Sequence, residues 1–303
     1  MSRVADQLGA IQPSAQGLIQ VGLIGSSIQQ SKSPALHEAE AAALGLDLSY
    51  RLIDLKAFGA GVEALPELLA TAQADGFAGV NITHPCKQAV LPLLDELSDE
   101  AALIGAVNTV VFKDGRRLGY NTDEWGFRES FRRQMAGARL DRVVQLGAGG
   151  AGAATAHAML TLGAGELALF DADPARARNL AQVLGAHFGA ERVRALLTLP
   201  SALAEADGLV HATPVGMADH PGLPLDAGLL RPDLWVAEVV YFPLETALLA
   251  QARRIGARTV NGGGMAVFQA ARAFRLFTGV EPDAERMLAH FLAEFAGSGE
   301  LSA

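Results

Sequence analysis

Cysteine, positive charge and long apolar runs are all scarce in this chain of 303 residues. The single cysteine, Cys86, excludes an internal disulfide and fits a reducing compartment. Lysine and arginine number 24 against 33 acidic residues, and this net charge of −9, without a basic run, argues against a nucleic-acid-binding surface. No stretch approaches the length of a membrane span, and residues 1–17 lack the apolar core of a signal peptide and are interpreted as a tail. We therefore expect a cytoplasmic protein that binds neither nucleic acid nor a membrane.

The rest of the composition is typical of a globular protein with two domains. Half of the residues are hydrophobic and 19% are charged, and 303 residues suffice for two separate cores. The seven histidines are scattered without metal-ligand spacing, so we expect no metal. A small anionic substrate stays compatible with the acidic net charge, because local positive groups decide its binding.

The second half of the chain predicts a Rossmann domain, that is, a doubly wound parallel sheet in an α/β fold. Short apolar strands alternate there with helices. The expected strands are 142–146, 166–171, 192–196, 208–212, 235–240 and 258–260, and the expected helices are 150–162, 174–188, 201–205 and 245–255.

The first half predicts a smaller α/β domain. Ser33 is the expected N-cap of its first helix, with Pro34 at the first helical position. Two final helices, 265–278 and 283–295, are expected to pack back on this domain, with the glycines at 262–264 as a hinge. The other expected elements are strands 18–25, 47–55 and 76–83, a hairpin at 106–120, and helices 60–74, 88–94 and 124–134.

A glycine pattern follows the strand at 142–146 and begins a helix of small residues. Gly147, Gly149 and Gly152 have the G-x-G-x-x-G spacing, which serves a tight turn, a close approach to a pyrophosphate and close packing of helix on strand. Asp171 follows 19 residues after Gly152, where a ribose-binding acid is expected. Because Asp173 already caps the next helix, and because a carboxylate repels a 2′-phosphate, Asp171 favours NAD over NADP as the cofactor.

Lys87 is a candidate for chemistry by its position. The strand at 76–83 runs into a helix start beside it, and open α/β sheets place their chemistry at such strand ends. A merely solvated lysine is disfavoured, because a cation in a first turn opposes the helix dipole. The neighbouring Cys86 is interpreted as a small buried thiol and not as a nucleophile.

Eight separated motifs then carry a resemblance to a known family. They are SKSPALH, GVNITHPCK, GAVNTVV, YNTDEWGF, GAGGAG, ATPVGM, VVYFPLET and GGGMAVFQA. In this order they resemble the shikimate dehydrogenase family, and especially its NAD-dependent quinate/shikimate dehydrogenase branch. The resemblance covers nearly the whole chain after the tail.

The resemblance implies a substrate-binding domain, formed by residues 1–122 and 262–303, and a Rossmann NAD-binding domain at 123–261. It implies reversible oxidation of the C3 hydroxyl of shikimate to 3-dehydroshikimate, with hydride passing to the nicotinamide. NAD is the expected cofactor, with NADP as the alternative, and the expected state is a monomer or homodimer. Quinate dehydrogenase is the alternative enzyme, and a non-catalytic NAD- or ligand-sensing module is the alternative of another class.

The resemblance also assigns residues. Lys87 and Asp123 are the catalytic pair; whether Lys87 accepts the proton or acts as an electrostatic anchor stays open. The implied substrate-binding residues are Ser31 and Ser33 for the carboxylate, Thr83, Asn108 and Gln269 for the ring hydroxyls, and Tyr241 nearby. The implied cofactor-binding residues are Gly147, Ala148, Gly149, Gly150, Ala151, Gly152, Asp171, Thr213, Pro214, Val239, Gly262 and Met265.

The chain departs from the family pattern at several positions. His211 stands where the family usually has Asn, and it is expected near the cofactor. Glu238 and Asn261 each stand where Asp is usual. Ser33 replaces the Thr frequent in quinate-using relatives, and this favours shikimate weakly, because one methyl group discriminates by only roughly 1–3 kcal/mol.

Overall fold

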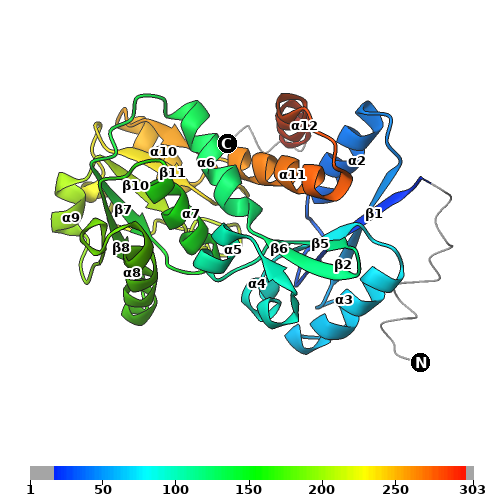
Figure 1. The fold of residues 1–303 in the computed structure, drawn as a ribbon. Coiled ribbons are helices and arrows are strands. Elements are labelled where there is room, and N and C mark those ends of the chain that lie inside the picture. The colour runs from blue at the N-terminus through cyan, green and yellow to red at the C-terminus, as the bar shows by residue number, and fades with distance from the viewer. Residues whose placement is uncertain (1–16, 298–303) are drawn as a thin grey trace. The chain divides into compact units, whose positions relative to one another are not determined.

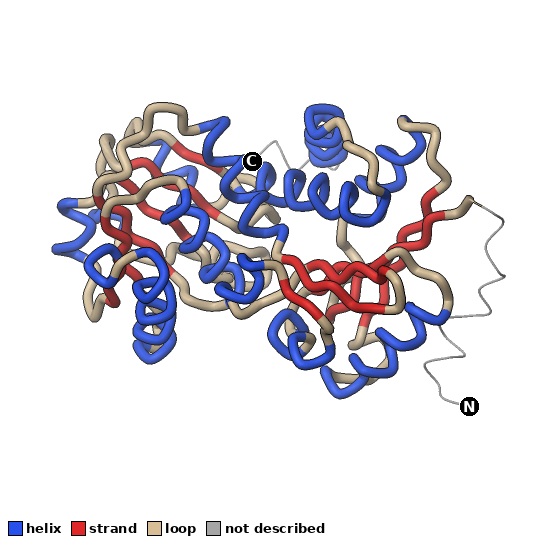
Figure 2. The backbone as a smooth tube through the Cα atoms, in the orientation of Figure 1, coloured by secondary structure: helices blue, strands red, loops and turns tan. Residues whose placement is uncertain are grey.

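The computed structural model describes residues 17–297, so the predicted tail, apart from Gly17, lies outside the described residues. The chain forms two compact units. Among the described residues, the first comprises residues 17–122 together with Ala270–Phe291, and the second comprises Asp123–Gln269 together with residues 292–297. In Figures 1 and 2 each unit contains a sheet flanked by helices, and the units are described separately below.

The first unit contains a mixed six-stranded sheet in the order β2-β1-β3-β5-β6-β4. β1 pairs in parallel with β2 and β3, whereas β5 is antiparallel to both β3 and β6. The strands are β1 (Ile19–Gly25), β2 (Leu48–Asp54), β3 (Gly79–Ile82), β4 (Glu96–Leu97), β5 (Thr109–Lys113) and β6 (Arg116–Tyr120). The hairpin predicted at 106–120 is β5 and β6, and it is confirmed.

Helices cover both faces of this sheet. α3 (Leu65–Ala74) packs against one face, where Leu68 meets Ile24 of β1 in an apolar core. Residues of β1 that alternate with Ile24 meet α2 (Ser33–Ala43) and Phe274 of α11 (Gly262–Thr278) on the other face. The expected return of the late chain onto the first domain is thereby confirmed for the part of α11 that belongs to this unit. The remaining helices are α4 (Cys86–Ala89), α5 (Asp99–Ile104) and α12 (Ala284–Gly297).

Two local predictions in the first unit are wrong. Ser33 is not an N-cap: the cap is Lys32, without a side-chain hydrogen bond, and Ser33 lies inside α2. The helix expected through residue 94 ends with α4 at Ala89 and gives way to a 3₁₀ turn at Leu91–Leu93. Pro92 explains the interruption, because proline lacks the N–H of the next helical bond and its ring clashes with the preceding turn.

The second unit contains an all-parallel sheet in the order β12-β11-β10-β7-β8-β9. This is the dinucleotide-binding order, with a switch point between β10 and β7, and it confirms the predicted α/β fold class with a Rossmann-type sheet. Its strands are β7 (Arg142–Leu146), β8 (Glu166–Phe170), β9 (Val193–Ala195), β10 (Gly208–His211), β11 (Trp235–Glu238) and β12 (Thr259–Val260). Its helices include α6 (Thr122–Gln134), α7 (Gly150–Thr161), α8 (Pro174–Phe188), α9 (Pro200–Glu205) and α10 (Ala247–Arg254).

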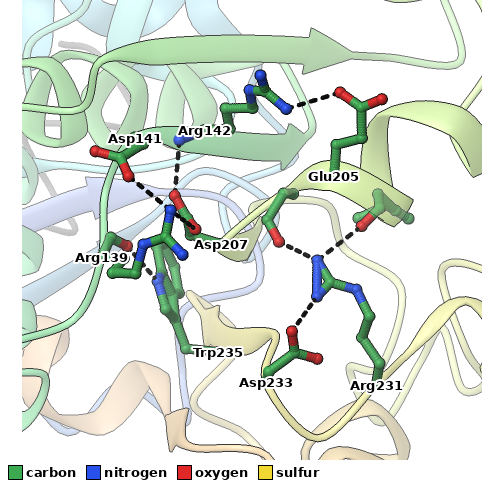
Figure 3. A network of polar contacts seen from close by, with 10 residues as sticks. Arg139, Asp141, Arg142, Glu205, Asp207, Arg231, Asp233 and Trp235 are labelled. Atoms are coloured by element: carbon green, nitrogen blue, oxygen red, sulfur yellow. Dashed lines mark hydrogen bonds and ion pairs between the residues drawn. The ribbon is translucent and has the colours of Figure 1, made fainter.

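Polar contacts close the amino-terminal edge of this second sheet (Figure 3). Asp207, just before β10, accepts a hydrogen bond from the backbone N–H of Arg142 at 2.9 Å and lies 3.4 Å from Arg139. The indole of Trp235 donates to the carbonyl of Arg139 at 2.9 Å. Arg231 donates to carbonyls at the end of α9. These groups hold the strand starts in register and leave the opposite, carboxyl edge for a ligand.

The glycines at 262–264, where the sequence predicts a hinge, are helical. They are the first turn of α11, and they are buried. A Cβ on Gly262 would lie 2.3 Å from the carbonyl oxygen of Val239, and one on Gly264 would lie 2.3 Å from the hydroxyl of Ser130. Close packing therefore explains these glycines. The two units divide inside α11, after Gln269, whereas the sequence predicts a domain boundary at 261/262.

Candidate active site

The glycine turn of the second unit has the shape of a phosphate cradle. Gly147 has a φ of +100°, and a Cβ there would lie 2.5 Å from the carbonyl oxygen of Ala212. A Cβ on Gly152 would lie 2.3 Å from the carbonyl oxygen of Gly147, so helix and turn touch through backbone. A Cβ on Gly149 would meet nothing within 4 Å. The first and third glycines are thus needed by the fold, and the second leaves open space where a ligand can approach.

The N-terminus of α7 adds backbone donors to this cradle. Its N-cap is Gly149, which provides no side-chain cap, and Gly150, Ala151 and Gly152 form the first turn. Helix N-termini present N–H groups and a positive dipole end, which suit a pyrophosphate.

Gln145, which sequence reasoning missed, holds the turn from below. Its buried amide donates to the carbonyls of Gly147 at 2.8 Å and Gly152 at 2.7 Å. Its oxygen accepts a hydrogen bond from Thr155 of α7 at 3.0 Å. A polar residue inside an otherwise apolar strand was the available signal. The result is a turn whose shape is set before any ligand binds.

Asp171 lies at the end of β8 and faces the same turn. Its carboxylate accepts from the backbone N–H of Ala148 at 2.7 Å and from that of Asp173 at 2.9 Å. Asp173 caps α8 through the N–H of Ala175, as predicted. A carboxylate can accept about four hydrogen bonds, so Asp171 retains acceptor capacity for a ribose hydroxyl.

The other predicted cofactor residues lie at the carboxyl ends of β10 and β11. Thr213 and Pro214 follow β10, and Val239 follows β11, with its N–H donating to the carbonyl of His211 at 3.0 Å. Gly262 packs against Val239, and Met265 is buried one turn later in α11. Together with the glycine turn, these residues occupy the edge of the sheet on both sides of its switch point.

The first unit brings several predicted substrate residues into one polar network. Ser31 donates to the hydroxyl of Ser33 at 3.2 Å, and Ser33 also bonds to Tyr50. The hydroxyl of Tyr50 donates to Asn81 at 2.8 Å, and Asn81 donates to the carbonyl of Asn108 at 3.3 Å. The side chain of Asn108 continues the network by donating to the hydroxyl of Thr122 at 2.9 Å.

Sequence reasoning missed Tyr50 and Asn81 as members of this network. A buried asparagine within the strand GVNI was the signal. Burial raises the pKa of Tyr50, so its hydroxyl stays protonated and keeps donating. Thr83 follows β3 directly, and its carbonyl accepts the N–H of Cys86.

Asp54, at the end of β2, shapes the loop that carries Ser31 and Ser33. Its carboxylate accepts from the backbone N–H groups of Ser27 at 2.9 Å and Ile28 at 3.1 Å, and from the side chain of Gln29 at 3.1 Å. Burial raises the pKa of Asp54, but these hydrogen bonds outweigh it and hold the pKa below its ordinary value. This ionised carboxylate was also missed, because its partners in the loop, Ser27, Ile28 and Gln29, are more than 20 residues away in sequence.

Lys87 lies in the short helix α4 at the end of β3 and is half-buried. Its carbonyl accepts the N–H of Val107, which ties α4 to the segment before β5. Burial raises the pKa of the Cys86 thiol to about 11, so Cys86 is a poor nucleophile at neutral pH. The buried-thiol prediction for Cys86 is confirmed.

Asp123 and Tyr241 lie in the second unit, with Gln269 of α11. Asp123 is a buried acid in the first turn of α6, where the helix dipole favours a carboxylate. Desolvation and the charge of Asp123 together raise the pKa of Tyr241, a side chain that is 40% exposed. The two groups are therefore electrostatic neighbours. Lys87 belongs to the other unit, and its pairing with Asp123 stays a prediction.

Residues 17–297 offer neither a metal site nor a membrane-spanning helix. No group of three or more His, Cys, Asp or Glu side chains gathers there in a way that could hold a metal ion. Within the same range, no helix is both long and apolar enough to span a bilayer.

Comparison with known proteins adds a consistent set of relatives. Residues 23–110 match the model of the shikimate dehydrogenase substrate binding domain, and residues 262–290 match that of the shikimate 5'-dehydrogenase C-terminal domain. A shikimate dehydrogenase (NADP+) of Streptomyces avermitilis is 61% identical over 280 residues, covering 92% of this chain and 96% of the relative. A quinate/shikimate dehydrogenase (NAD+) of Corynebacterium efficiens is 50% identical, covering 91% of this chain and 98% of the relative.

A solved structure shares the fold. Quinate dehydrogenase from Corynebacterium glutamicum in complex with NAD superimposes with a TM-score of 0.86 at 48% identity, covering 91% of this chain and 99% of that one.

Proposed function

The chain belongs to the shikimate dehydrogenase family, and from this premise we propose that it oxidises the C3 hydroxyl of shikimate reversibly, with NAD as the preferred cofactor. It is an oxidoreductase that acts on a CH–OH group with a nicotinamide dinucleotide. In the proposed division of labour, the unit with the mixed sheet binds substrate and the unit with the parallel sheet binds the dinucleotide. The glycine turn, with its open side at Gly149, is the single observation that carries the dinucleotide part of the proposal.

The residues present fit a dinucleotide. Gln145 holds the turn, the uncapped start of α7 offers N–H groups to the pyrophosphate, and Asp171 offers a ribose acceptor. When bound, the dinucleotide supplies the hydride acceptor. In this proposal the protein holds the two nucleotide halves of the dinucleotide on either side of the switch point of the parallel sheet.

The preference for NAD rests on Asp171. Because the N–H of Ala148 holds its carboxylate against the glycine turn, a 2′-phosphate at the ribose would lie beside a fixed negative charge. Two relatives at 61% and 50% identity are named for NADP and NAD respectively, so NADP is the alternative. Replacing Asp171 with Ser should lower the ratio of kcat/KM for NAD over NADP about tenfold or more, and an unchanged ratio would contradict the role.

The substrate proposal rests on the network in the first unit. Ser31 and Ser33 present hydroxyls from one tight turn, which suits a carboxylate, and Asn108 presents an amide held by Thr122. Thr83 and Gln269 are the further proposed partners of the ring hydroxyls, with Tyr241 nearby. Ser33 lacks the methyl group of the threonine found in many quinate-using relatives, and this favours shikimate. Quinate is the alternative substrate, because one solved relative is a quinate dehydrogenase.

Lys87 and Asp123 are the proposed catalytic residues. The hydroxyl must lose its proton as hydride leaves, and an ammonium or amine within hydrogen-bond reach can accept or stabilise that charge. In this proposal Lys87 exchanges the proton and Asp123 orients it. Lys87→Met should lower kcat about 10²-fold or more with a smaller effect on the KM for shikimate. Near-native turnover in Lys87→Met would overturn the assignment.

Spectrophotometry at 340 nm with shikimate and quinate, each with NAD and NADP, tests the function as a whole. The proposal expects the highest kcat/KM for shikimate with NAD. A highest value for quinate would favour the catabolic alternative. Absence of turnover with all four pairs would favour a ligand-sensing module.

A further inference from the structure

A chain of four polar side chains, three of them buried and the fourth, Thr213, partly buried, lies beneath the carboxyl ends of β10 and β11. His211 Nδ1 is 2.7 Å from Glu238 Oε1, and His211 Nε2 is 2.6 Å from the hydroxyl of Thr213. Thr246 donates its hydroxyl hydrogen to Glu238 Oε2. The side chains of His211 and Glu238 are completely buried, and Thr246 is 2% exposed. The glycine turn lies on the other side of the switch point, so these residues belong to the second half of the domain.

With Glu238 ionised and His211 neutral, the hydrogen bonds of this chain can run in one direction only. The hydroxyl of Thr246 already accepts the N–H of Leu249 as an N-cap, so its hydrogen is directed to Glu238. An ionised Glu238 accepts only, and it therefore requires a proton on His211 Nδ1. Nε2 of a neutral His211 is then a lone pair, and it accepts the hydroxyl hydrogen of Thr213.

Because the hydroxyl hydrogen of Thr213 is bonded to His211, the oxygen of Thr213 can only accept further hydrogen bonds. One lone pair of Thr213 Oγ1 takes the N–H of Val215 at 3.3 Å. The other lone pair is left for a donor outside the chain. The loop that follows Thr213 covers Glu238. Gly216 in this loop has a φ of +100°, and its backbone N–H donates to the carbonyl of His220 at 2.7 Å. A Cβ on Gly216 would lie 3.4 Å from Glu238 Oε1.

We propose that Glu238 and His211 are positioning residues that make Thr213 Oγ1 an acceptor for a donor on the nicotinamide half of the cofactor. This inference rests on the proposed function. In a dinucleotide-binding sheet the two halves bind one nucleotide each, and the half with the glycine turn and Asp171 takes the adenosine. Thr213 follows the first strand of the other half, where the nicotinamide riboside offers carboxamide N–H and ribose O–H donors.

The test compares variants that keep the shape of the site. Thr213→Val removes the acceptor, and Thr213→Ser is its matched control, which keeps the hydroxyl. His211→Leu combined with Glu238→Met replaces both buried partners by apolar groups of similar size, and leaves no unpaired charge that would prevent folding. The two changes are also combined with Thr213→Val. The readouts are the Kd of NADH by fluorescence titration, the KM of the oxidised dinucleotide, and kcat.

The expected results form a double-mutant cycle between Thr213 and the His211/Glu238 pair. Thr213→Val and the His211/Glu238 double variant each weaken dinucleotide binding about tenfold, the equivalent of one hydrogen bond, and raise the KM of the oxidised dinucleotide by a larger factor than the KM of shikimate. Their combination stays near tenfold instead of reaching a hundredfold, because both act on one oxygen. Thr213→Ser, which keeps the hydroxyl, loses much less dinucleotide affinity than Thr213→Val. A purely structural role would lower kcat and raise both KM values together.

A dinucleotide analogue separates the two donors. In 3-acetylpyridine adenine dinucleotide a methyl group replaces the carboxamide NH₂. If the donor is the carboxamide, the unaltered protein prefers NAD over this analogue about tenfold more than Thr213→Val does. If the donor is the ribose, Thr213→Val weakens both dinucleotides equally.

Three results would overturn the inference: unchanged binding in Thr213→Val, native binding in the double variant despite weak binding in Thr213→Val, or multiplied losses in the combination. The fluorescence titration needs no turnover. Failure of the proposed function, seen as no turnover in the unaltered protein, is therefore distinguishable from failure of this inference.

Discussion

Protonation of one buried histidine is predicted to make the stability of this protein fall between pH 6.5 and pH 3. His37 lies in α2 with its side chain fully buried and neither ring nitrogen hydrogen-bonded. Its ring centroid is 4.8 Å from that of Tyr50, 6.0 Å from that of Phe274 and 6.1 Å from that of Phe277. Burial among these rings lowers the pKa of His37 from 6.5 to about 3.

The sign of the effect follows from this lowered pKa. Below pH 6.5 the unfolded chain gains a proton at His37, and the folded protein does not until about pH 3. The free energy of unfolding therefore falls as the pH drops through this window. At 1.36 kcal/mol per pH unit, His37 costs about 2 kcal/mol between pH 6.5 and pH 5. For a protein of this size the melting temperature should fall by roughly 4–8 °C from this residue alone.

His37→Phe removes the titration and retains a ring in the apolar cluster. The melting temperature of the variant should therefore drop less between pH 7 and pH 5 than that of the unaltered protein, by the same roughly 4–8 °C. His187→Gln, at an exposed position of α8, is the matched control and should behave like the unaltered protein. Equal losses in His37→Phe and in the unaltered protein would refute the reasoning.

Three further predictions concern the loops that hold ligands. Asp54→Asn should raise the KM for shikimate about tenfold with an unchanged dinucleotide KM in steady-state kinetics, because the NH₂ group of asparagine replaces one of the two oxygens that accept the N–H groups of Ser27 and Ile28; equal changes in both KM values would contradict it. Gln145→Leu should weaken NADH binding about tenfold in fluorescence titrations, since the glycine turn loses two donors, and native affinity would count against that clamp. Gly152→Ala should cost about 1–3 kcal/mol of stability in urea unfolding, whereas Gly149→Ala should keep the stability and lose dinucleotide affinity; the reverse pattern would be inconsistent with their surroundings.

The parts of the fold and site that sequence predicts are those set by local rules. The glycine turn, the Asp173 cap and the hairpin each depend on a few consecutive residues, and each was predicted at its observed place. The cap expected at Ser33 fails because its hydroxyl bonds instead to Ser31, two residues earlier, and to Tyr50 of β2.

What sequence could not predict depends on pairing across the sheets. Asp54 and Gln145 act only because β2 ends beside the Ser27 loop and β7 lies under the start of α7. The Glu238–His211 pair likewise exists only because β10 and β11 are neighbours in register, with His211 opposite Glu238. A departure from the family pattern marked both residues in the sequence, but their contact appears only in the fold.

Direct hydride transfer from the C3 position of shikimate is the central claim. Shikimate carrying deuterium at C3 and on no other carbon, incubated with the protein and NAD, should yield reduced dinucleotide that carries the deuterium, measured by mass spectrometry. Lys87→Met should form this product at least about 10²-fold more slowly. Reduced dinucleotide without the label, with the deuterium released to water, would contradict the account.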